Sequence, residues 1–289
     1  MSKYIPVKLA YKTIEPLSGA GDKSPVIFLH GVVTSKEYWS DIPQTVANAS
    51  KRMVYLLDAR NHGDSEWSDE FNFDINSEDL VHFMDTMNIS KAVLLGHNMG
   101  GVTAIKTALK KKERVEMLIA EDTLVKKFPK PVLDMIITQL TMAQQAAEQM
   151  PADINEDGAK KFIFEFIYSH IPDEVKAVMK ERDIDEQRRL ISLRRNPDGR
   201  YGFKSNLKVI LNALKNTETL MAEPTGIYDG PACFIYGEHS PFSVKTDEQE
   251  IRQFFPNAEF EAIKDASHAV HIDCPREFTE AVLKFLSSL

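Results

Sequence analysis

Residues 94–101 read LLGHNMGG, an apolar run that leads into a turn bracketed by glycines. The run KAVLLGH at 91–97 is typical of a buried strand, and apolar residues at helical spacing follow from Val102. A strand that passes abruptly into a helix through small residues is the geometry of a nucleophile elbow, whose apex residue has a strained backbone. The apex of this G-x-N-x-G pattern is Asn98, whose carboxamide is not a nucleophile.

Other apolar runs along the chain repeat the strand pattern of residues 91–97. They are PVIFLHG (25–31), RMVYLLDA (52–59), VEMLIAED (115–122), ACFIYGE (232–238) and AEFEAI (258–263). Helical patterns lie between them at 36–49, at 77–87 with Asn76 or Ser77 as the cap, and at 102–112. This alternation predicts an α/β fold, with a mostly parallel sheet and helices on both faces.

The strand signals stop between residues 124 and 225. That stretch has helical patterns at 132–150, 157–170, 172–195 and 206–216, with an Asn-Pro-Asp-Gly turn at 196–199. We expect a helical cap at 124–225, inserted into an α/β core formed by residues 1–123 and 226–289.

Composition and charge narrow the range of partners. The 289 residues carry 35 basic and 43 acidic side chains, a formal charge of −8, which disfavours nucleic acid or an anionic membrane as the main partner. Two cysteines without a C-x-x-C arrangement suggest neither a disulfide framework nor a zinc site. No signal peptide, transit peptide or membrane-spanning run is evident, so we expect a cytoplasmic protein. A mitochondrial location stays open if a presequence has been removed.

Parallel sheets bind ligands beyond the carboxyl ends of their strands. Polar or glycine-rich loops follow six predicted strands, at residues 30–32, 58–65, 96–101, 121–122, 237–240 and 266–268. The backbone N–H groups of Val32 and Met99 are the candidate donors of an oxyanion hole. No metal site and no cofactor are predicted.

His268, in DASHAVHID after the last strand, is the candidate base. A base of this kind needs a carboxylate to fix its tautomer. Asp122 is the preferred acid and Glu238 the alternative, because the position that commonly carries the acid, in the loop after residue 237, is Ser240. The other histidines near strand ends, His30, His62, His97 and His271, are interpreted as structural or supporting.

LHGVVTSKEYW, DARNHGDS, GHNMGG, Asp122, GEHSPF and ASHAVH together resemble the abhydrolase-domain-containing protein 11 group of the α/β-hydrolase superfamily and similar small bacterial esterases. The resemblance runs from about residue 25 to 286 and is weak across 124–225. It implies an α/β-hydrolase fold with a Ser-Asp-His triad that cleaves small acyl or lipid esters. The family's serine falls on Asn98, its base on His268 and its acid on Asp122.

Three interpretations of the Asn98 position stay open. In the first, the protein is a hydrolytically impaired pseudoenzyme that binds a small apolar or acyl ligand. In the second, it is an active enzyme in which His268 and Asp122 work without a serine nucleophile. Asn98 then positions the substrate or, after deamidation, becomes an aspartate nucleophile. In the third, Asn98 was introduced into an ordinary serine ester hydrolase to trap a substrate.

Overall fold

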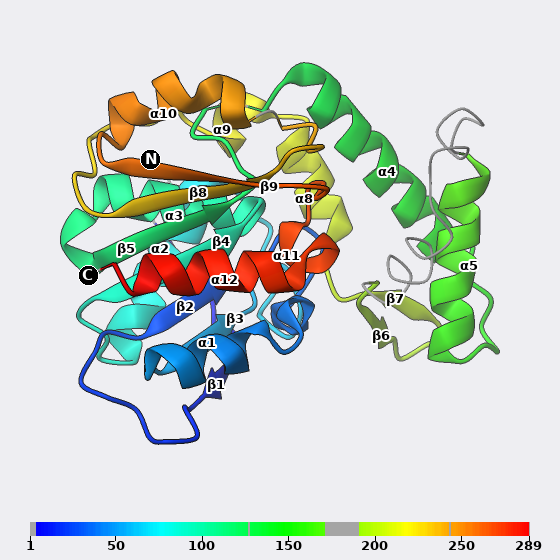
Figure 1. Cartoon of the computed structure of the whole chain (residues 1–289). Helices are drawn as coiled ribbons and strands as arrows, with labels where there is room; N and C mark the ends of the chain where they lie inside the picture. The colour runs from blue at the N-terminus through cyan, green and yellow to red at the C-terminus, as the bar shows by residue number, and fades with distance from the viewer. Residues whose placement is uncertain (1–3, 127, 171–190, 243, 289) are drawn as a thin grey trace.

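A computed structural model describes residues 4–126, 128–170, 191–242 and 244–288. Its centre is a seven-stranded sheet in the order β1-β3-β2-β4-β5-β8-β9 (Figure 1). All neighbouring strands run parallel except β1, which pairs antiparallel with β3. The strands are β1 (Tyr11–Ile14), β2 (Val26–Leu29), β3 (Val54–Leu57), β4 (Ala92–His97), β5 (Val115–Glu121), β8 (Ala232–Gly237) and β9 (Ala258–Ile263).

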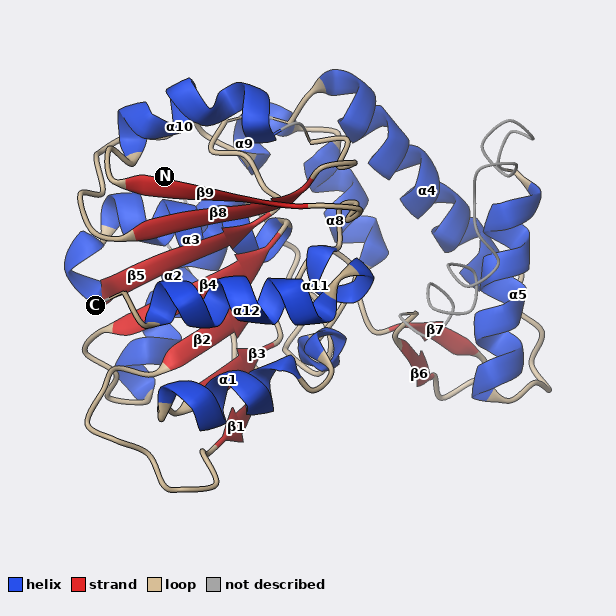
Figure 2. Ribbon diagram, in the orientation of Figure 1, coloured by secondary structure: helices blue, strands red, loops and turns tan. Residues whose placement is uncertain are grey.

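Helices cover both faces of the sheet, as expected for an α/β fold (Figure 2). One face packs against α1 (Ile42–Ser50) and α12 (Pro275–Leu286), and the other against α2 (Phe73–Thr86), α3 (Met99–Lys110) and α10 (Glu248–Phe254). Burial on both faces explains why β2, β4 and β8 have no exposed position. Short helical elements complete the core: η1 (Lys36–Trp39), η2 (Lys112–Arg114), η3 (Val244–Asp247) and α11 (Val270–Asp273).

The register of the central strands brings their carboxyl ends together. Leu29 of β2 pairs with Gly96 of β4, and His97 of β4 pairs with Glu121 of β5. The residues that follow these strands therefore meet at one edge of the sheet, as the strand-end argument predicts.

The stretch between β5 and β8 contains α4 (Lys130–Glu148), α5 (Glu156–Ser169), α8 (Leu207–Leu214) and α9 (Thr217–Leu220). It also contains a two-stranded hairpin, β6 (Leu193–Arg195) and β7 (Tyr201–Phe203), that the sequence did not predict. The expected helix at 172–195 is wrong at its end, because Leu193–Arg195 pairs as a strand across the 196–199 turn. Residues 172–190 of that prediction lie outside the described part of the chain. The cap boundaries at 124 and 225 stay a prediction.

Two helix starts differ from the predicted ones. Helix α2 begins at Phe73 because the Asn72 side chain accepts a hydrogen bond from Ile75 N at 2.8 Å, which caps the first turn. The residues predicted as caps, Asn76 and Ser77, are buried inside the helix. Helix α3 begins at Met99, immediately after the elbow apex. No described helix combines the length and the apolar character needed to cross a membrane.

Candidate active site

The elbow connects β4 to α3 through Asn98. Its backbone has φ 49° and ψ −113°, a conformation that costs about 1–3 kcal/mol for a residue other than glycine. The neighbouring glycines allow it, because a Cβ on Gly100 would lie 2.1 Å from Leu29 O and a Cβ on Gly96 would lie 2.3 Å from Gly100 O. Two backbone hydrogen bonds fix the turn: Asn98 N donates to Glu121 O, and Gly100 N donates to His30 O, both at 3.1 Å.

The Asn98 side chain lies at this edge of the sheet and is only 5% exposed. Its carboxamide caps no helix N–H and makes no hydrogen bond to any described residue. Both its donor and its acceptor are therefore unoccupied by the described part of the chain.

The structure brings the predicted base and acid together. His268 Nδ1 lies 2.6 Å from Asp122 Oδ2; the carboxylate is fully buried and the imidazole is 30% exposed. Since Nδ1 donates to the carboxylate, the neutral ring keeps its Nε2 lone pair to accept a proton. Glu238, the alternative acid, is exposed, and no described contact joins it to His268.

Ser240 has a role that the sequence did not reveal. Its Oγ donates to Asp122 Oδ2 at 2.5 Å and accepts from Phe242 N at 3.1 Å. The Phe242 ring in turn stacks on His268, with ring centroids 4.4 Å apart and an angle of 23° between the planes. The loop after β8 thus supports both members of the His268–Asp122 pair.

The predicted oxyanion donors lie on two well-fixed turns. Met99 is the first residue of α3, where backbone N–H groups have no partner within the helix, and no described group outside α3 accepts from it. Val32 follows Gly31, whose carbonyl accepts from Thr34 Oγ1 at 2.8 Å.

The His30 side chain holds the turn that precedes Val32. Its Nε2 accepts a hydrogen bond from Ala59 N at 3.1 Å, so the neutral ring donates from Nδ1 to Gly31 O at 2.7 Å. Burial lowers the pKa of His30 and favours this neutral form.

A second carboxylate–histidine pair lies behind the first. Glu121, the residue before Asp122, accepts from both the backbone N and the Nδ1 of His271, at 2.9 and 2.7 Å. His97, the residue before Asn98, donates from Nε2 to His268 O at 3.2 Å. Burial, together with His268 and His271 nearby, holds the pKa of His97 well below its usual value, so this ring stays neutral.

His97, Glu121 and His271 are also the one group of possible metal ligands found among the described residues. The geometry favours hydrogen bonding instead. Glu121 is already engaged by His271, and His97 Nδ1 faces Gly31, where a Cβ would lie only 2.7 Å away. The cluster therefore serves the loop that carries His268.

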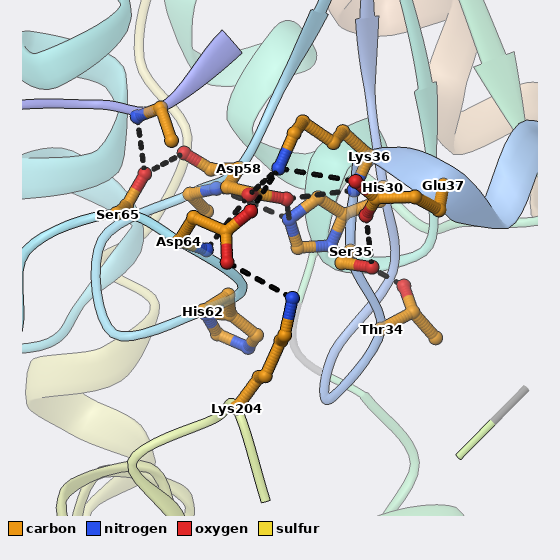
Figure 3. A network of polar contacts seen from close by, with 12 residues as sticks. His30, Thr34, Ser35, Lys36, Glu37, Asp58, His62, Asp64, Ser65 and Lys204 are labelled. Atoms are coloured by element: carbon orange, nitrogen blue, oxygen red, sulfur yellow. Dashed lines mark hydrogen bonds and ion pairs between the residues drawn. The ribbon is translucent and has the colours of Figure 1, made fainter. Parts of the chain in front are cut away.

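A network of charged side chains joins the loops after β2 and β3 to the segment after β7 (Figure 3). Lys36 Nζ donates to the fully buried Asp58 and to Asp64, both at 2.7 Å. Lys204, which follows β7, donates to the other oxygen of Asp64 at 2.9 Å. Hydrogen bonds from Lys36 and Lys204 lower the pKa of the Asp64 carboxyl. This network had no signal in the sequence beyond the polar DARNHGDS loop.

Apolar side chains cover the elbow from the side of α4 and α8. Met99 belongs to a cluster with buried residues of both helices, and Val32 packs against it. The helix residues in this cluster are Leu133 and Leu140 on α4, and Ile210, Leu211 and Leu214 on α8. A separate polar cavity of about 310 Å³ lies between the loop after β2, the start of α5 and the segment around β6. It is lined by Thr34, Ser35, Glu37, Tyr38, Glu156, Lys160, Ile191, Ser192, Leu193 and Lys204.

Comparison with known proteins agrees with this architecture. The family model for the alpha/beta hydrolase fold matches residues 24–275, and the chain belongs to that family. More narrowly, it is an esterase/lipase-type hydrolase similar to the abhydrolase-domain-containing protein 11 group. It is 32% identical over 283 residues to "sn-1-specific diacylglycerol lipase ABHD11" of Danio rerio, which covers 97% of this chain and 83% of the relative.

Two further matches extend the comparison. "Abhydrolase domain-containing protein C22H12.03" of Schizosaccharomyces pombe is 28% identical, with 98% of each chain covered. Among solved structures, a "Marine microorganism esterase" superimposes with a TM-score of 0.76 at 27% identity, over 96% of this chain and 99% of that one. The fold and the broad family predicted from the sequence are confirmed.

Proposed function

We propose that this protein is an esterase/lipase-type α/β hydrolase with impaired hydrolytic activity that binds a small apolar or acyl ligand. One observation carries the proposal: Asn98 occupies the elbow apex at the same edge of the sheet as a His268–Asp122 pair joined at 2.6 Å. A hydroxyl at this apex would be the group that His268 activates, whereas a carboxamide cannot be activated in this way. Loss of a triad nucleophile costs about a million-fold in turnover.

Polar groups suited to an acyl head group surround the apex. The N–H groups of Val32 and Met99 are candidate donors to a carbonyl or carboxylate oxygen. Asn98 adds an amide donor and an amide acceptor, neither of which a described residue occupies. These groups support binding of an acyl compound where an ester would otherwise react.

The apolar cluster around Met99 supports an apolar ligand tail. We assign residues 124–225 the role of a cap, whose α4 and α8 side chains would cover that tail. The names of the relatives, a diacylglycerol lipase and an esterase, concern ester chemistry and fit an acyl ligand.

A ligand titration tests this proposal. Decanoate, added to the protein and followed by calorimetry, is expected to bind saturably. Ile137→Lys, which places a charge in the apolar cluster on α4, is expected to weaken binding by about tenfold or more. Met135→Lys is the matched control, because Met135 is 43% exposed on the same helix. Absence of binding, or equal loss in both variants, would contradict the proposal.

A second candidate function rests on His268. Its imidazole is 30% exposed, and its Nε2 has no hydrogen-bond partner among the described residues. Such a group could activate water directly on a bound substrate, without a covalent intermediate. If the unmodified protein hydrolyses an ester and His268→Ala abolishes that activity, the result would favour direct catalysis by His268 over a function in binding alone.

A further inference from the structure

We infer that Asn98 is a site of self-modification, at which the backbone nitrogen of Met99 attacks the side-chain carbon Cγ of Asn98. The attack forms a cyclic imide, which water then opens. The inference rests on the backbone geometry of the elbow and does not require the proposed function.

The geometry of Asn98 favours ring closure. With ψ at −113°, the Cα–Cβ bond of Asn98 is nearly eclipsed with the bond from its carbonyl carbon to Met99 N. A planar five-membered imide requires this arrangement, because those two bonds become the ring edges on either side of the Cα–C bond. In helices and strands ψ holds the same two bonds well apart. The elbow backbone therefore already holds Cβ of Asn98 and N of Met99 on the same side of the Cα–C bond. Only rotation about the Cα–Cβ bond is then needed to bring Cγ to the nitrogen, and such pre-orientation lowers the barrier to cyclisation.

No residue in the described part of the chain restrains the reacting groups. Met99 N–H, at the start of α3, donates to no described group, and the Asn98 carboxamide makes no hydrogen bond to the described residues. A hydrogen bond to either group would have to break before the ring could close. The strain of φ 49° adds to the tendency to react, because it raises the free energy of the starting state.

The chemistry balances with water as the only added reactant. Met99 N forms a bond to Cγ, the bond from Cγ to Nδ2 breaks, and Nδ2 leaves as ammonia with the proton from Met99 N. Water then cleaves one of the two ring C–N bonds. Cleavage at Cγ gives aspartate, and cleavage at the main-chain carbonyl gives isoaspartate.

His268 is the base that we assign to assist the first proton transfer. Its ring lies 4.7 Å from that of His97, the residue immediately before Asn98. Its Nδ1 is engaged by Asp122, so Nε2 is the atom that accepts a proton. The product carries one more negative charge at the apex than the starting amide, which would repel a carboxylate ligand.

Peptide mapping by mass spectrometry tests the inference. Freshly purified protein is incubated at neutral pH, either native or in urea, and the conversion of Asn98 is followed, with Asn98→Asp as the standard for mass and retention. Asn88 is the internal control, because it is exposed, has φ 55° and precedes a bulky residue, Ile89. We expect native Asn98 to convert at least about tenfold faster than Asn88 and faster than Asn98 in urea.

Two further variants sharpen the result. Asn98→Gln cannot form the five-membered ring and is expected to keep its amide. His268→Ala is expected to slow the conversion of Asn98 several-fold without changing that of Asn88. An Asn98 amide that persists in the native protein, or that converts as fast in urea, would overturn the inference. Mass is the readout throughout, so this outcome is independent of ligand binding or ester hydrolysis.

Discussion

Ser240 Oγ donates to Asp122 Oδ2 at 2.5 Å, on the same carboxylate oxygen that binds His268. Ser240 occupies the loop after β8, and Asp122 follows β5, so the acid comes from one strand end and its support from the next. A hydroxyl that donates to a buried carboxylate stabilises its charged form and fixes its orientation.

The contribution of Ser240 can be measured once a nucleophile is present. In an Asn98→Ser background, we expect Ser240→Ala to lower kcat by about tenfold and to leave KM nearly unchanged, because a hydrogen bond to a charged group contributes about 1.5–3 kcal/mol. Steady-state kinetics with a short-chain ester would show whether kcat falls while KM stays the same. An unchanged kcat would mean that the Ser240 hydrogen bond is not needed to position Asp122.

Breaking the Glu121–His271 pair should destabilise the fold. Both side chains are fully buried, so Glu121→Gln or His271→Ala leaves a buried partner uncompensated, at a cost of about 3–5 kcal/mol. Urea unfolding measures the loss. Arg276→Ala, at an exposed ion pair with Glu280, is the control and should leave the midpoint unchanged. Equal midpoints in all variants would show that the buried pair is not structural.

Stability should fall in mild acid because of buried histidines. Burial lowers the pKa of His30, His62 and His97 below the ordinary 6.5, for His62 to about 3. In the unfolded chain these histidines bind protons below pH 6.5, whereas in the folded protein they stay neutral. The free energy of unfolding is therefore highest above pH 6.5 and declines as the pH falls toward the pKa values of the folded state.

The quantity to measure is the slope of the free energy of unfolding against pH. Each such histidine contributes up to about 1.4 kcal/mol per pH unit in that window. Urea unfolding from neutral to about pH 5 should show the decline, and His62→Gln should reduce its slope. A flat profile across this window would contradict the neutral, buried state of these rings.

The elbow glycines should be far less replaceable than glycines in open turns. A Cβ on Gly100 would lie 2.1 Å from Leu29 O, so Gly100→Ala is expected to cost about 3 kcal/mol or more and to reduce the soluble yield. Gly199→Ala is the comparison, because nothing lies within 4 Å of its Cβ and only the positive φ of 84° opposes it, at about 1 kcal/mol. Thermal denaturation distinguishes them; similar melting temperatures would contradict the packing argument.

The core strands could be predicted because a strand buried on both faces is a continuous apolar run. Strand β1 (Tyr11–Ile14) escaped prediction because it is largely exposed and is defined by antiparallel pairing with β3, which no local pattern reveals. The start of α2 was misplaced because Asn72 and Asn76 are equally good caps by residue type. Only the bond from Ile75 N to Asn72 shows which one is used.

For the site, the strand-end rule located Asn98, Asp122 and the turn before Val32, since it depends only on the order of elements. The supporting contacts could not be located in this way. Ser240 and Asp122 are separated by 118 residues, and His97 and His268 by 171. Such contacts depend on side-chain directions that are set by packing. The assigned roles of His268, Asp122, Val32 and Met99 stay predictions until variants are tested.

The most direct test of the central claim is the hydrolysis of p-nitrophenyl butyrate by the protein and by its Asn98→Ser variant, side by side at neutral pH. We predict that the serine variant exceeds the unmodified protein by at least about a thousandfold, and that His268→Ala added to it removes the gain. A serine variant no faster than the unmodified protein would contradict the claim that Asn98 alone silences an otherwise assembled site.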